Sequence, residues 1–351
     1  GLWREGCSAG EDGCQPENAL TGQISWGDGS APITVPDTYK NFRFWRQTTI
    51  PSLGAGQIAT LSNNTIGYEF DWEQTSYKSS YPNGRVPLSS TDINGKLHKL
   101  SLYRHSSGAL VFGAGTVQWS WGLDSAHDRG LSVPDLRMQQ ATVNLFADMG
   151  VQPGSIQGGL VAVTASNDNL APASVITSPV HNANISNSIT YITISGTSAD
   201  AGGGVVAGVE ISVDNGVSWQ FAIGTSNWTY NWLPASSGSY TIKVRAFDDL
   251  GNLETTGTAP SANAITVNVT VTSPVCPCKI FPASPTPANT LLNDNTSIEA
   301  GVKFKSTVNG YITAIRFFKP STSGTYTVNL WDNATQQKLS FAAAQAAGTG
   351  W

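Results

Sequence analysis

The chain has 351 residues and a net charge of −5, and only 12% of its residues are charged, against roughly 25% in an average soluble domain. Lysine and arginine do not cluster, which argues against a nucleic-acid partner, and no apolar run reaches the ~20 residues of a membrane-spanning helix. A hydrophobic content of 40% excludes a disordered chain, while 36 glycines and 18 prolines favour short strands and turns over long helices.

Polar, proline-bearing stretches divide the chain into three blocks. A length of 351 residues also favours more than one domain, since single hydrophobic cores stop growing at about 250–300 residues. We expect the blocks to span residues 1–165, 175–272 and 281–351, with linkers at 166–174 and 273–280. Residue 1 is Gly rather than Met, and the chain stops at Trp351 soon after a strand pattern. We therefore expect a piece of a longer protein.

One helix stands out in the first block, between Pro134 and Gly150. Proline is tolerated in a first helical turn, Asp135 suits the positive end of the helix dipole, and glycine is a common stop. The residues expected along its main side and beside it are Leu136, Gln140, Val143 and Ala147, with Leu145, Phe146 and Met149. Around this helix, residues 99–103, 109–112 and 116–121 have strand patterns separated by glycine turns.

The second block contains five segments of alternating apolar and polar residues, at 192–196, 208–213, 228–232, 238–246 and 265–271. Such alternation over about 100 residues predicts an immunoglobulin-like sandwich. The predicted core residues are Ile194, Val209, Ile211, Trp219, Trp232, Ile242, Val244 and Ala246. The third block has similar patterns at 301–304, 311–318 and 326–331, and it is short for a complete sandwich.

The four cysteines form two close pairs, Cys7 with Cys14 and Cys276 with Cys278. In an exported chain they can form disulfides, and four cysteines allow three pairings. Free thiols are the alternative. A zinc site is less favoured because no histidine lies near either pair at ligand spacing.

Residues 68–73 place three acids among aromatic residues. Glu69 lies between Tyr68 and Phe70, and desolvation by these neighbours would raise its pKa and suit it to general acid or base catalysis. The alternative is a strand whose acids face outward. A second candidate is the loop 124–129, which places His127 beside acids, but a Ser–His–Asp triad needs spatial neighbours, so solvated charges are the better interpretation.

Two turns in the second block involve aspartates. The segment 212–219 fits an S-x-D-x-G-x-S-W turn, in which Asp214 bonds the turn amides, Gly216 takes a positive φ and Trp219 fills the core. The segment 248–252 offers oxygens suited to Ca²⁺ but lacks the acid spacing of an EF-hand, so we interpret it as a plain turn. We predict no metal site in this sequence.

Several stretches of the first block carry a family resemblance, at 16–22, 44–46, 67–71, 102–104, 107–124 and 139–150. In this order they resemble the C-terminal catalytic-region domain of the N,N-dimethylformamidase large (β) subunit and its secreted relatives. The resemblance implies an amidotransferase-like α/β core and a mononuclear iron held by tyrosines and a glutamate that lie upstream of Gly1. It also maps one family catalytic position onto Glu69.

The second block resembles bacterial Ig-like modules. The third resembles a β-sandwich family of unknown function found in large exported bacterial proteins, through residues 281–282, 299–304 and 310–319. The fold class expected is therefore multidomain and mainly β: a fragment of an α/β amidotransferase-like domain with short strands and one helix, an Ig-like sandwich, and an incomplete β-sandwich.

Two function hypotheses follow. The first is an exported or cell-surface bacterial protein whose parent hydrolyses a C–N amide bond, while this fragment by itself, without its iron ligands, is inactive. The second is a non-catalytic surface protein that binds glycan or a cell-surface polymer through exposed aromatic rings. Trp228, Tyr230 and Trp232 alternate and share one face, which either stacks on sugars or packs in the core. The sequence indicates neither the natural substrate nor the oligomeric state.

Overall fold

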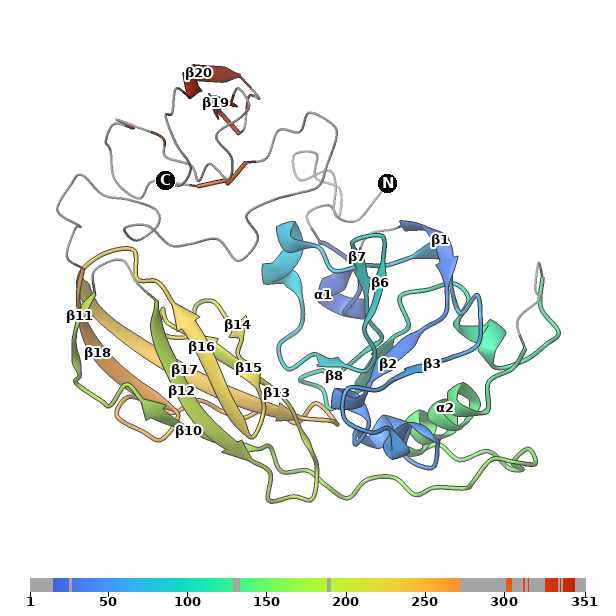
Figure 1. The fold of residues 1–351 in the computed structure, drawn as a ribbon. Coiled ribbons are helices and arrows are strands. Elements are labelled where there is room, and N and C mark those ends of the chain that lie inside the picture. Colours follow the sequence, from blue (N-terminus) through green and yellow to red (C-terminus); the bar gives the residue numbers. More distant parts are fainter. Residues whose placement is uncertain are drawn as a thin grey trace. The chain divides into compact units, whose positions relative to one another are not determined.

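The computed structural model describes residues 15–24, 27–128, 133–187, 191–271, 301–304, 312, 315, 326–333, 335 and 337–344 (Figure 1). The chain forms two compact units, Gly1–Thr272 and Ser273–Trp351. Strands predominate among the described residues of both, which confirms the multidomain, mainly β fold class.

The first part of unit 1 consists of short strands joined by turns and single-turn helices. Its strands are β1 (Gly27–Ala31), β2 (Thr34–Pro36), β3 (Ile58–Thr60), β4 (Ile66–Phe70), β5 (Val86–Pro87), β6 (Thr91–Ile93), β7 (Lys96–His98), β8 (Ser101–Arg104) and β9 (Leu110–Gly113). They pair as β1–β4, β2–β3, β6–β7 and the three-stranded sheet β5–β8–β9. The helices are α1 (Asn18–Thr21), α2 (Leu136–Asp148) and the 3₁₀ turns η1 (Asp37–Tyr39), η2 (Arg43–Trp45), η3 (Ile50–Ser52), η4 (Thr75–Ser80) and η5 (Trp119–Gly122).

Helix α2 confirms the prediction of a helix between Pro134 and Gly150. Asp135 is its N-cap, and the carboxylate accepts a hydrogen bond from the backbone N–H of Arg137 at 2.9 Å. Gly150 follows the helix at φ 80°, the left-handed conformation that ends many helices.

The buried face of α2 agrees with the prediction only in part: Gln140, Leu145 and Ala147 are buried, but several of the predicted apolar residues are not. Met138, Ala141 and Leu145 contact the core, whereas Leu136 and Phe146 are 53% and 48% exposed. The polar residues Gln140 and Asn144 also lie inside, because their side chains bond backbone carbonyls of other segments. Hydrogen bonding of this kind leaves no trace in an apolar periodicity.

The predicted strand at 116–121 is wrong. Only Thr116 bridges to a strand, at Phe70, and residues 119–122 form the 3₁₀ turn η5. Trp119 packs against Phe44 and Phe112, with ring centroids 6.5 and 5.3 Å away. The tryptophans anchor a turn here rather than line a strand. The predictions at 99–103 and 109–112 correspond to β8 and β9.

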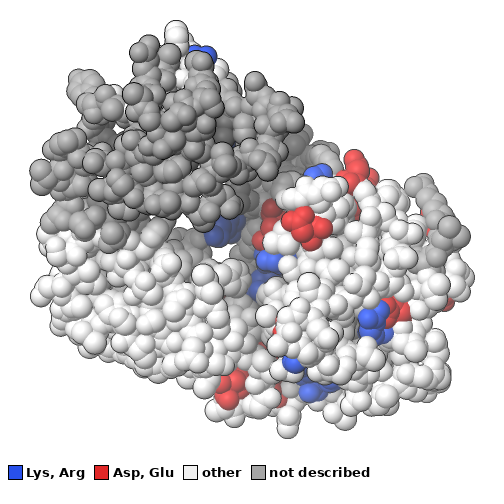
Figure 2. Space-filling view, in the orientation of Figure 1, with Lys and Arg blue, Asp and Glu red and all other residues white. Residues whose placement is uncertain are grey.

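The second part of unit 1 is the predicted sandwich. Its strands are β10 (Ala173–Ser178), β11 (Asn184–Asn187), β12 (Ile192–Ala199), β13 (Val206–Ser212), β14 (Gln220–Phe221), β15 (Ile223–Gly224), β16 (Asn227–Trp232), β17 (Gly238–Asp248) and β18 (Ala264–Val271). One sheet has the order β10–β12–β16–β15 and the other β11–β18–β17–β13–β14 (Figure 1). All five predicted segments lie in strands of these sheets. Charged side chains are sparse on the visible face of the sandwich, as Figure 2 shows.

Seven of the eight predicted core residues are buried in the sandwich, and Trp219 is the exception. The Trp219 ring is half-buried and lies against the guanidinium of Arg245, whose Cζ is 3.8 Å from the ring centroid. Turn geometry places Trp219 at the edge of the sheet, where a cation–π contact replaces core packing.

The two parts of unit 1 share a hydrophobic core. Ala207 of β13 and Phe247 of β17 belong to the same buried cluster as Val86 of β5. Every residue of β13 is buried, because one face packs in the sandwich and the other meets the first part of the unit. At this contact the backbone N–H of Gly84 donates to Glu210 Oε1 at 3.3 Å.

In unit 2 the described strands are the antiparallel pair β19 (Tyr326–Trp331) and β20 (Lys338–Ala344). The prediction at 326–331 is thus confirmed. Residues 301–304 are not in a strand, and most of 311–318 lies outside the described residues. No helix in the described ranges has the length and apolar character to cross a bilayer.

Candidate functional site

Glu69 lies near the end of β4, directly opposite Asp28 of β1 in the antiparallel pair. Both side chains are exposed, so two carboxylates stand side by side on this strand pair. No ion pair among the described residues includes Glu69.

The backbone that carries Glu69 is fixed from both sides. Thr116 Oγ1 accepts a hydrogen bond from the N–H of Gly67 at 3.0 Å and donates to the carbonyl of the same residue at 3.1 Å. Gly67 has φ 139°, and a Cβ there would lie 2.5 Å from the carbonyl oxygen of Gly29. Only glycine fits this close approach of β1 to β4, so Gly67 sets the strand pairing that presents Glu69.

The aromatic neighbours of Glu69 do not cover it. The Phe70 side chain is 2% exposed and lies in the core, while Tyr68 is 46% exposed on the surface. The Phe70 ring thus lies inward, while the Glu69 carboxylate is in contact with water. The catalytic role of Glu69 stays a prediction.

Glu73, the third acid of this stretch, takes part in a partly buried ion-pair network. Its Oε1 accepts a hydrogen bond from Arg85 Nη2 at 2.5 Å and lies 3.8 Å from Lys99 Nζ. The Arg85 guanidinium also covers the Tyr81 ring, with Cζ 4.2 Å from its centroid. Burial lowers the pKa of Lys99, an effect that Glu73 partly opposes. This network fixes the chain after β4 and is structural.

A second buried polar group lies behind β4. The His98 side chain is fully buried, its ring contacts Phe70 edge-on, and Nε2 lies 3.0 Å from the carbonyl oxygen of Ala114. Burial lowers the pKa of His98 to about 4, so the imidazole is neutral at neutral pH. It is shielded from solvent and cannot exchange protons with a surface substrate.

The other sequence candidates are not assembled into a catalytic site. The His127 ring stacks on Trp121, with centroids 4.6 Å apart, and its Nδ1 lies 3.1 Å from the carbonyl oxygen of Asp128. The described residues of loop 124–129 thus show no Ser–His–Asp arrangement. Residue 129 and all four cysteines lie outside the described residues.

The hydrogen bonds of the two aspartate turns agree with the prediction, although Trp219 does not fill the core. Asp214 accepts hydrogen bonds from the Ser218 N–H and the Ser212 hydroxyl, and Gly216 has φ 92°. Burial alone would raise the pKa of Asp214, but these hydrogen bonds lower it. Asp248 likewise closes a turn by accepting from the N–H of Asn252 at 2.8 Å.

The three rings proposed as a sugar-stacking face pack inside the sandwich instead. Trp228 and Trp232 are 1% and 5% exposed, and Tyr230 packs against the same core. Their shared face was predicted correctly, and it is the core face of β16. These rings are therefore not available to a glycan.

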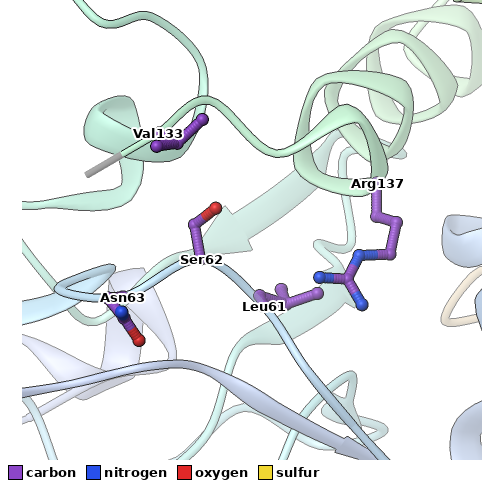
Figure 3. A pocket seen from close by; sticks show the side chains of 5 residues that line it. All are labelled: Leu61, Ser62, Asn63, Val133 and Arg137. Atoms are coloured by element: carbon purple, nitrogen blue, oxygen red, sulfur yellow. The ribbon is translucent and has the colours of Figure 1, made fainter.

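A shallow cavity of about 260 Å³ lies at the N-terminus of α2 and is lined by Leu61, Ser62, Asn63, Val133 and Arg137 (Figure 3). The Arg137 guanidinium is already occupied, since Nη2 donates to Asp135 Oδ2 at 2.6 Å and to the carbonyl of Thr60 at 2.8 Å. Because Nε also donates to Asp135, at 2.9 Å, several donors of this guanidinium are used internally, which weakens it as an anion receptor.

Three family models match the chain in the predicted order. Residues 1–132 match the N,N-dimethylformamidase beta subunit-like C-terminal domain. Residues 172–244 match a bacterial Ig domain, and residues 284–351 match a domain of unknown function. The three resemblances inferred from sequence are thereby confirmed. No curated protein matches the chain.

Similarity to solved structures is low. One is a structure of fibronectin(III)-like modules of Clostridium thermocellum CbhA, with 24% identity, a TM-score of 0.24 and coverage of 28% of this chain and 98% of the other. Another is an engineered protein with 22% identity and a TM-score of 0.19, which covers 35% of this chain and 24% of the other.

The described residues do not fit the iron that the family resemblance implies. A mononuclear site needs several ligands that converge on one point, and Glu69 has an aspartate opposite it rather than a tyrosine. The one group of three described acids that could share a metal lies elsewhere, at Asp168, Asp200 and Asp248.

Proposed function

We propose that the first part of unit 1 belongs to an amide C–N hydrolase, in which Glu69 acts as a general base or acid at a surface completed by residues outside this sequence. The match of residues 1–132 to the dimethylformamidase-like family supports this proposal. The observation that carries it is the exposed Glu69 carboxylate on a strand held by Gly67 and Thr116.

The geometry of β4 suits proton transfer at a surface. A carboxylate held on a fixed strand and open to water can accept a proton from a water molecule or return one to a leaving amine. The neighbouring Asp28 carboxylate lies directly opposite Glu69 on β1 and shares its exposure to water.

The test is Glu69→Gln in the longer protein that we propose, assayed with small N-alkyl formamides and carboxamides. Glutamine keeps the shape and hydrogen bonding of the side chain but not its basicity. We expect turnover to fall by about 10²–10⁴-fold with an unchanged melting temperature. Asp28→Asn is the matched control and should change turnover far less. Near-normal turnover in Glu69→Gln would contradict the proposal.

The 351-residue chain by itself supplies a second test. Because the family resemblance assigns the iron ligands to residues that this sequence does not contain, we expect the chain to leave formamides and carboxamides intact. Hydrolysis by this chain above the rate of a Glu69→Gln control would overturn that expectation and locate the complete site within the sequence.

We also propose that the protein is exported by a bacterium. The low charged content and the match to a bacterial Ig domain support this, since such modules suit extracellular multidomain proteins. Fractionation of the native host, followed by mass measurement before and after reduction, tests it. Recovery in the cytoplasm with all four thiols reduced would contradict export.

A further inference from the structure

Three aspartates from separate segments of unit 1 converge at one end of the sandwich. Asp168 lies in the segment before β10, Asp200 follows β12, and Asp248 is the last residue of β17. One carboxylate oxygen from each lies within 4.8 Å of the other two. Two ligands on opposite sides of a Ca²⁺ ion are up to about 5 Å apart, since each bond is roughly 2.3–2.6 Å long. The three oxygens can therefore share one ion.

Each carboxylate is positioned by its own local turn. Asp168 Oδ1 accepts a hydrogen bond from the N–H of Leu170 at 3.1 Å, and Asp200 Oδ1 accepts one from Gly202 at 2.6 Å. Asp248 accepts from Asn252, through the backbone N–H at 2.8 Å and the side-chain amide at 2.6 Å. These bonds orient the acids before any ligand arrives.

A second observation points to a missing ligand. Asp168 Oδ2 and Asp200 Oδ2 are buried atoms that accept no hydrogen bond from any described residue. The Asp248 side chain is itself 0% exposed, and no described ion pair includes any of the three acids. Buried carboxylate oxygens without a partner are costly, and a cation is the partner that satisfies several of them together.

The backbone beside the acids leaves room for this arrangement. A Cβ on Gly204 would lie 2.5 Å from Asp168 Oδ2 and 3.3 Å from Asp200 Oδ2, and one on Gly202 would collide with the Asp168 carboxylate. The loop that follows Asp200 must therefore lack side chains at these two positions. A cavity of about 300 Å³ borders the cluster at Asp168 and at Asn252, the residue that donates to Asp248.

We propose that Asp168, Asp200 and Asp248 bind a calcium ion. All candidate ligands are oxygens, which hard cations prefer. Zinc is disfavoured because its usual protein ligands include nitrogen and sulfur. Calcium is favoured over magnesium because it accepts irregular sets of carboxylate and backbone oxygens, whereas magnesium requires near-ideal octahedral geometry.

The ion would join the segment before β10 to the sandwich. Asp168 comes from that segment, while Asp200 and Asp248 come from two sheets of the sandwich. The direct hydrogen bond from the sandwich to this segment is weak, since Asn252 Nδ2 lies 3.5 Å from the carbonyl oxygen of Asp168. Calcium binding would thus stabilise this junction and resist its opening.

The test uses the 351-residue chain, freed of metal with EDTA and returned to chelator-free buffer at pH 7.5. Calcium chloride is titrated by calorimetry, and the melting temperature is followed in parallel. We expect one ion per chain with a Kd of about 10⁻⁴–10⁻³ M, as in extracellular modules. At saturating calcium the melting temperature should rise by about 5 °C.

Two variants and one control assign the site. Asp168→Asn and Asp200→Asn should each weaken calcium binding at least ~10-fold and remove the thermal shift. Asp248 is left in place because it is fully buried and its replacement could unfold the chain. Asp214→Asn removes an acid of the same sandwich whose oxygens are hydrogen-bonded, so it should keep the calcium response. The assignment is overturned if wild type shows no saturable binding at 10 mM calcium, if both variants bind like wild type, or if magnesium binds more tightly than calcium.

Discussion

Arg46 and Asp148 form a two-pronged ion pair, in which Nη1 donates to Oδ2 at 2.7 Å and Nη2 donates to Oδ1 at 3.1 Å. Arg43 Nε adds a third bond to Oδ1 at 2.9 Å, and the backbone N–H of Ser166 adds a fourth at 3.1 Å. The last residue of α2 thereby holds both η2 and the segment that leads to the sandwich.

We expect Asp148→Asn to lower the free energy of unfolding by about 3 kcal/mol, because it leaves two partly buried guanidinium groups without a carboxylate. Chemical denaturation measures the change. Asp92→Asn, in an exposed turn, is the control and should cost less than about 0.5–1 kcal/mol. Equal losses in the two variants would show that the ion pair contributes nothing specific.

Asn144 is fully buried, and its Nδ2 donates to the carbonyl oxygens of Phe44 at 2.9 Å and Arg46 at 2.6 Å. Asn144→Leu keeps the branched shape of the side chain and leaves these two carbonyls without their donor, so we expect a loss of about 2–4 kcal/mol. Phe146→Ala, on the exposed side of α2, should cost far less despite removing a larger apolar side chain. Urea denaturation measures both losses. If Phe146→Ala unfolded at a lower urea concentration than Asn144→Leu, this account would be contradicted.

His98 makes stability depend on pH. Its pKa is about 4 in the folded chain and about 6.5 when unfolded. The unfolded state therefore binds a proton first as the pH falls, so the contribution of His98 is complete above pH 6.5 and is lost between pH 6.5 and 4. The loss amounts to about 3 kcal/mol.

The measurement is the difference in unfolding free energy between wild type and His98→Gln across this range. Burial raises the pKa of Asp248 to about 6, which acts in the opposite direction, and taking the difference removes that effect. We expect the advantage of wild type at pH 7 to shrink as the pH falls. A constant difference would mean that His98 does not titrate in this way.

Phe247 joins the two parts of unit 1, since this residue of the sandwich is fully buried in the core of the first part. We expect unit 1 to unfold in a single calorimetric transition. Phe247→Ala should cost about 3–5 kcal/mol and separate the transitions of the two parts. Ile223→Ala, 74% exposed on β15, is the control. One unchanged transition in Phe247→Ala would show that the parts are coupled by other contacts.

The sequence predicted those features that depend on near neighbours along the chain. Alternation located the strands of the sandwich, and Asp135 with Gly150 marked the ends of α2, because capping and side-chain period act over a few residues. The turn of Asp214 was predicted for the same reason. For Glu69 the sequence named a residue to test, and its exposure on β4 agrees with the outward-facing alternative rather than with desolvation by Tyr68 and Phe70. The catalytic role of Glu69 itself stays a prediction.

Contacts between distant segments were decided by tertiary structure. The sequence could not indicate that the second face of β13 is buried, that Asn144 points inward, or that Trp219 leaves the core for Arg245. Nor could it bring Asp168 and Asp200 to the turn of Asp248, which by itself was interpreted correctly as a turn. Packing and buried hydrogen bonds join residues far apart in sequence, and their partners leave no periodic signal.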